Sequence, residues 1–202
     1  MLAGISHDLK TPLTRMHLEL ALQKDSESKE ALLEDIKEMK KMLAEYLNFA
    51  KGEGAETAKE VNLHDFLREF FTKFPQDKIS LAPFTPLLDK TMALRPYALK
   101  RALENIMSNG LRYGKHVWFK GDITDKEAVF VFEDDGPGIP ENRRGDVFRP
   151  FVRLDESRNT ETGGYGLGLS ICQDIITAHG GSILLDSSPN HGGLKVIVTL
   201  PL

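Results

Sequence analysis

A histidine and an aspartate stand side by side near the start of the chain, in the run Ser6-His7-Asp8-Leu9-Lys10-Thr11-Pro12-Leu13. An imidazole is a nucleophile near neutral pH, and an adjacent carboxylate can fix its tautomer and accept its proton. On a helix, Thr11 lies one turn beyond His7, so its hydroxyl could orient a water on the same side. By itself, however, a His-Asp pair is most often polar surface, and Thr11 could equally satisfy backbone groups beside Pro12.

Two asparagines, Asn105 and Asn109, lie one helical turn apart in the segment 96–113. Their amide oxygens can converge on one hard cation, and magnesium is the cation that fits best. Magnesium usually keeps waters and substrate phosphates in its shell rather than an all-protein cage. The pattern predicts a magnesium site, with a solvated helix face as the alternative.

Two glycine-rich segments could bind a nucleotide. In Asp134-Asp135-Gly136-Pro137-Gly138-Ile139, the carboxylate at a strand end can accept from an exocyclic amine, and the glycines let the backbone approach a flat ring such as adenine. The run Gly163-Gly164-Tyr165-Gly166-Leu167-Gly168-Leu169 opens a predicted helix, whose free N–H groups and dipole favour phosphate. Taken singly, the first could be an ordinary turn and the second a flexible loop.

A long polar segment without helical or strand periodicity lies between the two glycine signatures, as in loops that close over ligands. Its arginines, Arg153 and Arg158, could reach phosphates. Phe148 and Phe151 are expected to anchor the segment to the core, because aromatic side chains bury large apolar areas.

The elements that must position these residues begin with a helical hairpin. Apolar residues recur at steps of three and four along 2–20 and along 32–50, with the polar segment 24–28 between them. Pro12 is expected to bend the first helix just past His7. Such a narrow apolar stripe predicts a four-helix bundle of two chains, the alternative being packing on the rest of the same chain.

The small and charged residues of 52–60 are typical of a linker, so we expect a hairpin domain at 1–51 and a second domain at 61–202. The second domain is predicted to be an α+β layer, with Asn62 as the cap of its first helix. Its helices are expected at 63–71, 96–113 and 167–178, and its strands at 79–81, 117–119, 128–132, 183–185 and 195–200.

The composition argues against a nucleic-acid-binding protein, a membrane-spanning chain and a disulfide-stabilised fold. The chain has 202 residues, a net charge of −4 and a pI near 5.9, so it offers no basic field for nucleic acid. A stretch of about 18 apolar residues, which a membrane span requires, is absent from the sequence. The single Cys172 excludes an internal disulfide and suits a reducing cytoplasm. This fragment is therefore expected to be soluble.

The order of these motifs, from the His-Asp box to the last glycine loop, resembles the cytoplasmic core of bacterial sensor histidine kinases, close to the osmosensing type. The resemblance covers essentially the whole chain. It implies a dimerising phosphoacceptor hairpin of the HisKA type, followed by a two-layer α+β sandwich. That sandwich is the ATP-binding domain shared with gyrase, heat-shock protein 90 and mismatch-repair ATPases.

The resemblance also implies roles for individual residues. His7 would take the γ-phosphate of ATP with Asp8 as general base, and a response regulator receiver domain would then accept the phosphoryl group. Asn105 and Asn109 would hold Mg²⁺, Asp134 would read adenine, and 139–163 would be the ATP lid. The other nucleotide-binding residues would be Arg112, Tyr113, Gly136, Gly138, Ile139, Arg153, Arg158, Gly164, Gly166, Leu167 and Gly168.

Three residues depart from the family pattern. Tyr165 replaces a small residue in the last glycine loop, Gly110 replaces an alanine, and Lys10 replaces the more frequent arginine, keeping the charge but losing the bidentate fork. Met1 lies only six residues before His7. We therefore expect an excised cytoplasmic portion of an inner-membrane sensor, without its sensor segment and membrane spans.

The activity has alternatives. The same bundle could act chiefly as a phosphatase of the phosphorylated regulator, with Thr11 orienting the attacking water. A conformational ATPase and an inactive dimeric scaffold of the same fold are the others.

Overall fold

The computed structural model describes residues 2–22, 27–52, 56–83, 89–154 and 166–202. The chain divides into two compact units, Met1–Ala55 and Glu56–Leu202. Among the described residues, no helix combines the length and the apolar character needed to cross a bilayer.

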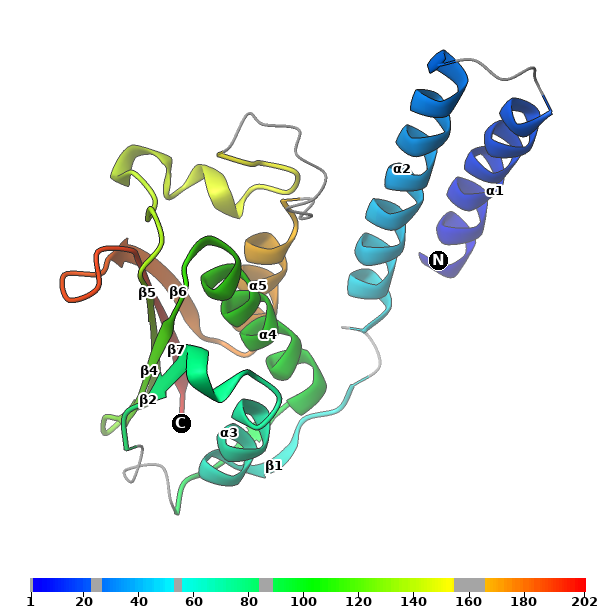
Figure 1. Ribbon diagram of the computed structural model, residues 1–202. Coiled ribbons are helices and arrows are strands. Elements are labelled where there is room, and N and C mark those ends of the chain that lie inside the picture. The colour runs from blue at the N-terminus through cyan, green and yellow to red at the C-terminus, as the bar shows by residue number, and fades with distance from the viewer. Residues whose placement is uncertain (1, 23–26, 53–55, 84–88, 155–165) are drawn as a thin grey trace. The chain divides into compact units, whose positions relative to one another are not determined.

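The first unit is a helical hairpin. Helix α1 (Leu2–Ala21) and helix α2 (Glu27–Gly52) pack against each other along their length (Figure 1). Ile36 is buried at their contact, whereas several apolar side chains stay exposed: Met16, Leu18, Leu22, Leu32 and Met39. The predicted hairpin is confirmed, and the two described helices do not cover these apolar side chains by packing on each other.

A five-stranded sheet with the order β2-β4-β5-β7-β6 forms the second unit's framework. Strand β2 runs parallel to β4, and the other neighbours are antiparallel. The strands are β2 (Ile79–Leu81), β4 (Val117–Ile123), β5 (Glu127–Asp134), β6 (Ser182–Ser187) and β7 (Leu194–Pro201).

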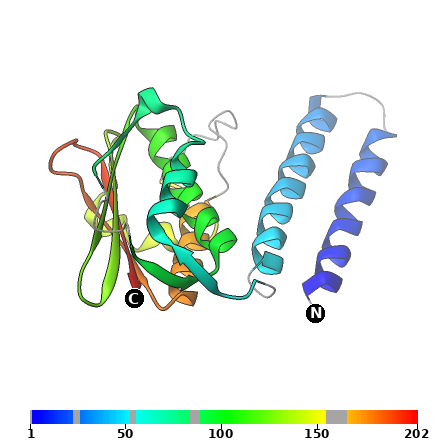
Figure 2. The same cartoon turned by 90° about the horizontal axis from the view of Figure 1, so that it is seen from below.

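The second unit's helices cover one face of this sheet, as Figure 2 shows. They are α3 (Leu63–Phe71), α4 (Pro96–Tyr113) and α5 (Gly168–Ala178). Burial alternates along β5 and β7, so every second side chain enters the core beneath the helices. Phe130 and Val198 are fully buried there. The predicted α+β two-layer fold is confirmed.

One part of the fold differs from the expectation. Residues 59–62 form strand β1 (Lys59–Asn62), which pairs antiparallel with β3 (Thr91–Leu94) in a separate two-stranded sheet. The last two residues of the predicted linker 52–60 therefore belong to a strand. Lys59 and Glu60 are exposed, so this strand has no alternating apolar pattern that a sequence could reveal.

Two contacts lock the start of α4 to its surroundings. The carboxylate of Glu56 accepts from the backbone N–H groups of Tyr97 and Ala98, each at 2.9 Å. At the same end, His179 Nε2 accepts from the Arg95 N–H at 3.1 Å, while His179 Nδ1 donates to the Ile175 carbonyl oxygen at 2.7 Å. His179 thus has a structural role at the end of α5.

We predict that Glu56→Ala lowers the free energy of unfolding of the second unit by about 1 kcal/mol, because two N–H groups at a helix N-terminus lose an anionic acceptor. Denaturant unfolding followed through the fluorescence of Trp118, the only tryptophan in the chain, measures this. Glu60→Ala, at an exposed strand position, is the matched control. Equal stability of the two variants would contradict the capping role.

Candidate functional site

A buried carboxylate lies at the end of β5. Asp134 is only 7% exposed, and its Oδ1 accepts from the N–H of Gly136 at 2.9 Å and from the N–H of Leu194 at 3.0 Å. Among the described residues, no hydrogen bond reaches the other oxygen, Oδ2. That oxygen is therefore available to a ligand that donates a hydrogen bond, as an exocyclic amine does.

Burial raises the pKa of Asp134 above its usual value, because removal from water disfavours the charged form. The bonds from Leu194 and Gly136 act in the opposite direction without cancelling the shift, and the nearby charge of Asp135 raises the pKa further. A partly desolvated carboxylate facing a cavity is typical of a binding site.

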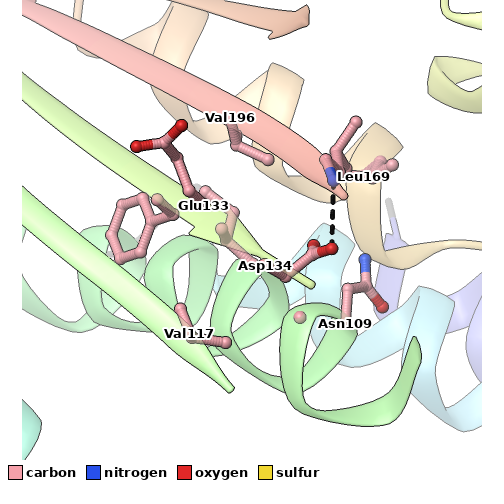
Figure 3. Close-up of a pocket in the computed structure, with 10 residues that line it drawn as sticks. Asn109, Val117, Glu133, Asp134, Leu169 and Val196 are labelled. Carbon is pink, nitrogen blue, oxygen red and sulfur yellow. Dashed lines mark hydrogen bonds between the residues drawn. The ribbon is translucent and has the colours of Figure 1, made fainter. Parts of the chain in front are cut away.

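A cavity of about 20 Å³ lies directly beside this carboxylate (Figure 3). Asn109 of α4 and Asp134 of β5 lie next to each other in its wall, with Leu169 of α5 opposite. The remaining lining residues are apolar except for Glu133: Ile106, Gly110, Val117, Phe132, Leu194 and Val196. The lining is thus mostly apolar, with a few polar groups, a composition typical of ligand-binding sites.

Close backbone packing surrounds Asp134. A side chain at Gly193 would collide with the carbonyl and carboxylate oxygens of Asp134, so only glycine fits there. Gly138 has a φ of 67° and lies against the carbonyl of Gly193. The predicted adenine loop, which includes Gly136 and Ile139, therefore rests on the turn that precedes β7.

The two asparagines of α4 face the start of α5. Asn105 Nδ2 donates to the carbonyl oxygen of Gly168 at 3.4 Å, and the Cα of Gly168 also faces the Asn109 amide. Since Nδ2 is the donor in this bond, the Asn105 amide oxygen can still coordinate a cation. The donor set of two amide oxygens fits magnesium, and the described residues contain no cluster of three acidic, histidine or cysteine ligands.

The start of α5 is suited to phosphate. Leu167 is its N-cap residue and makes no side-chain cap, and among the described residues no side chain binds the N–H groups of the first turn, which suits them to an anion. Gly166 adopts a φ of 69°, and its carbonyl accepts from Phe151 N–H at 3.0 Å. The structure therefore brings Asn105, Asn109, Asp134 and the α5 N-terminus together.

The structure does not assign the other predicted residues to this cluster. Arg112 and Tyr113 lie exposed in the last turn of α4, and neither lines the cavity. Arg153 is partly buried. Gly164, Arg158 and Tyr165 lie outside the described residues. His7, Asp8 and Thr11 belong to α1, but their side chains are not among the described ones.

Sequence reasoning missed two supporting residues. Asp135 Oδ1 accepts from the N–H groups of Lys115 and His116 at 2.6 and 2.9 Å, and these bonds hold its pKa below the usual range. Asp135 thus joins the α4–β4 turn to the adenine loop. Leu194 holds Asp134 through a backbone N–H, for which the only sequence signal is the Gly192-Gly193 pair before a strand.

Comparison with known proteins now decides the family. The profile described as "Histidine kinase-, DNA gyrase B-, and HSP90-like ATPase" matches residues 95–202. The chain belongs to this family. The profile of the "His Kinase A (phospho-acceptor) domain" matches residues 1–55. The expected resemblance to sensor histidine kinases is confirmed.

Curated relatives agree. The chain is 36% identical over 213 residues to "Sensor histidine kinase CpxA" of Escherichia coli, which covers 100% of the chain and 46% of the relative. It is 31% identical over 202 residues to "Sensor histidine kinase GtrS" of Pseudomonas aeruginosa, with 100% and 41% covered. The chain thus spans less than half the length of these relatives.

Solved structures share the fold. The NMR structure of the histidine kinase domain of the E. coli osmosensor EnvZ has a TM-score of 0.55 at 33% identity, covering 74% of this chain and 92% of that one. The crystal structure of full-length ShkA in complex with AMPPNP has a TM-score of 0.70 at 23% identity, covering 99% and 45%.

We predict that Asp134→Asn and Asn109→Ala separate adenine recognition from metal binding. Asp134→Asn removes a charged acceptor, so it should lower the affinity for both adenosine and ATP. The expected loss is about 10- to 100-fold, which corresponds to one hydrogen bond to a charged group. Asn109→Ala should lower the affinity for ATP only when magnesium is present, and it should leave the affinity for adenosine unchanged. Calorimetric titration of both ligands, with and without magnesium, checks this, and identical losses in both variants would contradict the assignment.

The raised pKa of Asp134 gives a second expectation. As the pH falls, the carboxylate takes up its proton earlier than an ordinary aspartate does, so the adenosine affinity of the wild type should decline at mildly acidic pH. The Asp134→Asn variant lacks this titration, and its affinity should stay flat across the same range. A pH series of the titrations measures both.

Proposed function

We propose that this chain is the catalytic core of a two-component sensor histidine kinase. It would transfer the γ-phosphoryl group of ATP to His7 and then to an aspartate of a response regulator. The observation that carries the proposal is the buried Asp134 carboxylate beside a glycine loop, in a chain whose first unit matches a phosphoacceptor domain.

The second unit supplies the nucleotide site. Asp134 would accept from the adenine amine through Oδ2, while the loop of Gly136, Gly138 and Ile139 lies along the ring. The N–H groups at the start of α5, with Gly166, Leu167 and Gly168, would bind the phosphates. Arg112, Tyr113, Arg153, Arg158 and Gly164 complete the proposed set of nucleotide-binding residues.

Asn105 and Asn109 would hold magnesium, and the bound ion would neutralise charge that develops on the phosphate oxygens. Two amide ligands suffice for this role, since magnesium draws further ligands from water and from the nucleotide itself. The contact between Asn105 and Gly168 keeps this amide beside the phosphate-binding helix end.

The first unit supplies the nucleophile. A ring nitrogen of His7 would attack the γ-phosphorus in line, the bond to the bridging oxygen would break, and ADP would leave. Asp8 would accept the imidazole proton. Phosphoryl transfer needs little further covalent help, so positioning and charge neutralisation supply most of the catalysis.

The exposed apolar side chains of the hairpin support a homodimer. Met16, Leu32 and Met39 remain 48%, 45% and 39% exposed in a single chain, although they belong to the apolar stripes of the two helices. Pairing two hairpins into a four-helix bundle would cover them. The same bundle would present His7 to the receiver domain of the regulator. We further propose that the chain is the cytoplasmic portion of an inner-membrane sensor.

We predict that incubation with Mg-ATP gives the chain an acid-labile, base-stable phosphoryl group and that His7→Gln abolishes it while ATP binding persists. A phosphoramidate hydrolyses in acid, whereas phosphoserine does not. His17→Gln is the matched control, because His17 lies on the same helix with Leu18 rather than an acid after it. Full labelling of His7→Gln would overturn the phosphoacceptor assignment, and ATP hydrolysis without labelling of the wild type would favour a conformational ATPase.

We predict that Thr11→Ala impairs dephosphorylation of the response regulator while autophosphorylation persists. Thr11 lies one turn from His7 on α1, so its hydroxyl could orient a water toward a docked phosphoaspartate. The helix should survive, since alanine is the better helix former. Decay of a pre-phosphorylated receiver domain with added ADP measures the effect, with circular dichroism as the check on helicity. An unchanged decay would leave Thr11 with a structural role beside Pro12.

A further inference from the structure

We propose that Arg144 is a positioning residue for nucleotide binding, which holds the loop that follows Asp134 against the end of β6. The inference rests on the proposed function, because it assumes that this loop contacts the nucleotide. Arg144 lies between the short 3₁₀ helices Glu141–Arg143 and Asp146–Phe148, and it does not line the cavity.

The guanidinium of Arg144 ties together two segments that are far apart in sequence. Its Nε donates to the carbonyl oxygen of Ile139 at 3.3 Å, within the adenine loop. Its Nη1 donates to Asp186 Oδ1 at 3.0 Å and its Nη2 to Ser187 Oγ at 2.7 Å, at the end of β6. The Arg144 side chain is only 20% exposed, whereas Asp186 is 61% exposed, so the bond to Ile139 is better shielded from solvent than the ion pair.

The acceptors on β6 are themselves held in place. Asp186 Oδ1 also accepts from the backbone N–H of Ser187 at 2.8 Å, and this bond, together with the Arg144 charge, holds the pKa of Asp186 below its usual range. The Ser187 N–H thus orients the Asp186 carboxylate independently of Arg144. The guanidinium meets a fixed acceptor, and less conformational entropy is lost in forming the contact.

The turn between β6 and β7 fixes the other end of the same loop. Leu194 N–H binds Asp134 and Gly138 lies against Gly193, while the Ser188 hydroxyl donates to Glu133 Oε1 at 2.9 Å. The adenine loop is thus attached to this hairpin at Asp134 and again at Ile139. A loop that is ordered before binding loses less entropy when the nucleotide arrives, and the affinity rises accordingly.

Arginine is required at this position because three nitrogens donate to three separate acceptors. A lysine would keep the charge but has one nitrogen on a flexible stem, so it cannot span Ile139 and both β6 side chains. We therefore expect the affinity for ATP to fall stepwise from arginine to lysine to alanine at position 144.

The test measures ATP affinity and phosphorylation rate in Arg144→Ala, Arg144→Lys and the control Arg143→Ala, whose guanidinium pairs with Asp146 on the surface. Arg144→Ala should raise the KM for ATP by about 5- to 30-fold, the equivalent of losing one charge-assisted contact, with kcat unchanged at saturating ATP. Arg144→Lys should lie between the wild type and Arg144→Ala, and Arg143→Ala should match the wild type.

A double-mutant cycle with Asp186→Asn tests whether Arg144 acts through its contact with Asp186. If the contact positions the loop, the second substitution adds less to KM in the Arg144→Ala background than in the wild type. An unchanged KM in Arg144→Ala, a fall in kcat with KM unchanged, or full additivity would each overturn the proposal. A wild type that binds no ATP would instead overturn the proposed function, so the two failures are distinguishable.

Discussion

The proposed nucleotide site depends on one desolvated carboxylate. Asp134 lies in the core at the end of β5, where its charge is costly to keep, and its raised pKa shows that two backbone hydrogen bonds do not fully compensate. Those bonds come from Gly136 in its own loop and Leu194 on β7. The ends of β5 and β7 must therefore stay in register to hold the Asp134 carboxylate in place.

A second constraint is the contact between α4 and α5, which places the proposed magnesium ligands and the N-terminus of α5 beside that carboxylate. Polar links run along the whole contact: Asn105 to Gly168, Cys172 Sγ to the Ala102 carbonyl at 3.2 Å, and Arg95 to His179. Burial raises the pKa of the Cys172 thiol to about 12, so this cysteine stays a neutral packing residue. Because both helices are rigid, Asn105, Asn109 and the start of α5 lie close enough to bind one ligand, as proposed above.

Local patterns in the sequence were enough to predict most elements. Apolar spacing predicted the hairpin and α4, and Asn62 was correctly predicted as a cap, since its Oδ1 accepts from Asp65 N–H at 3.0 Å. Strands β1 and β3 escaped prediction because their pairing is between residues about thirty positions apart and one of them is largely polar. The ordered motifs predicted a set of nucleotide-binding residues; of these, Asn109 and Asp134 line the cavity, whereas Arg112 and Tyr113 lie away from it.

The sequence by itself determined the predicted chemistry: a histidine beside an acid, paired asparagines, and a carboxylate before a glycine loop are each ambiguous alone, but their order along the chain is specific to one family. Only the tertiary structure decided how that chemistry is supported. It showed that Asp134 is buried, that Gly193 must be glycine, and that Arg144 joins Ile139 to Asp186. These are long-range contacts, and they form because the sheet order places β7 beside β5 and β6 beside β7, an arrangement that residue spacing does not encode.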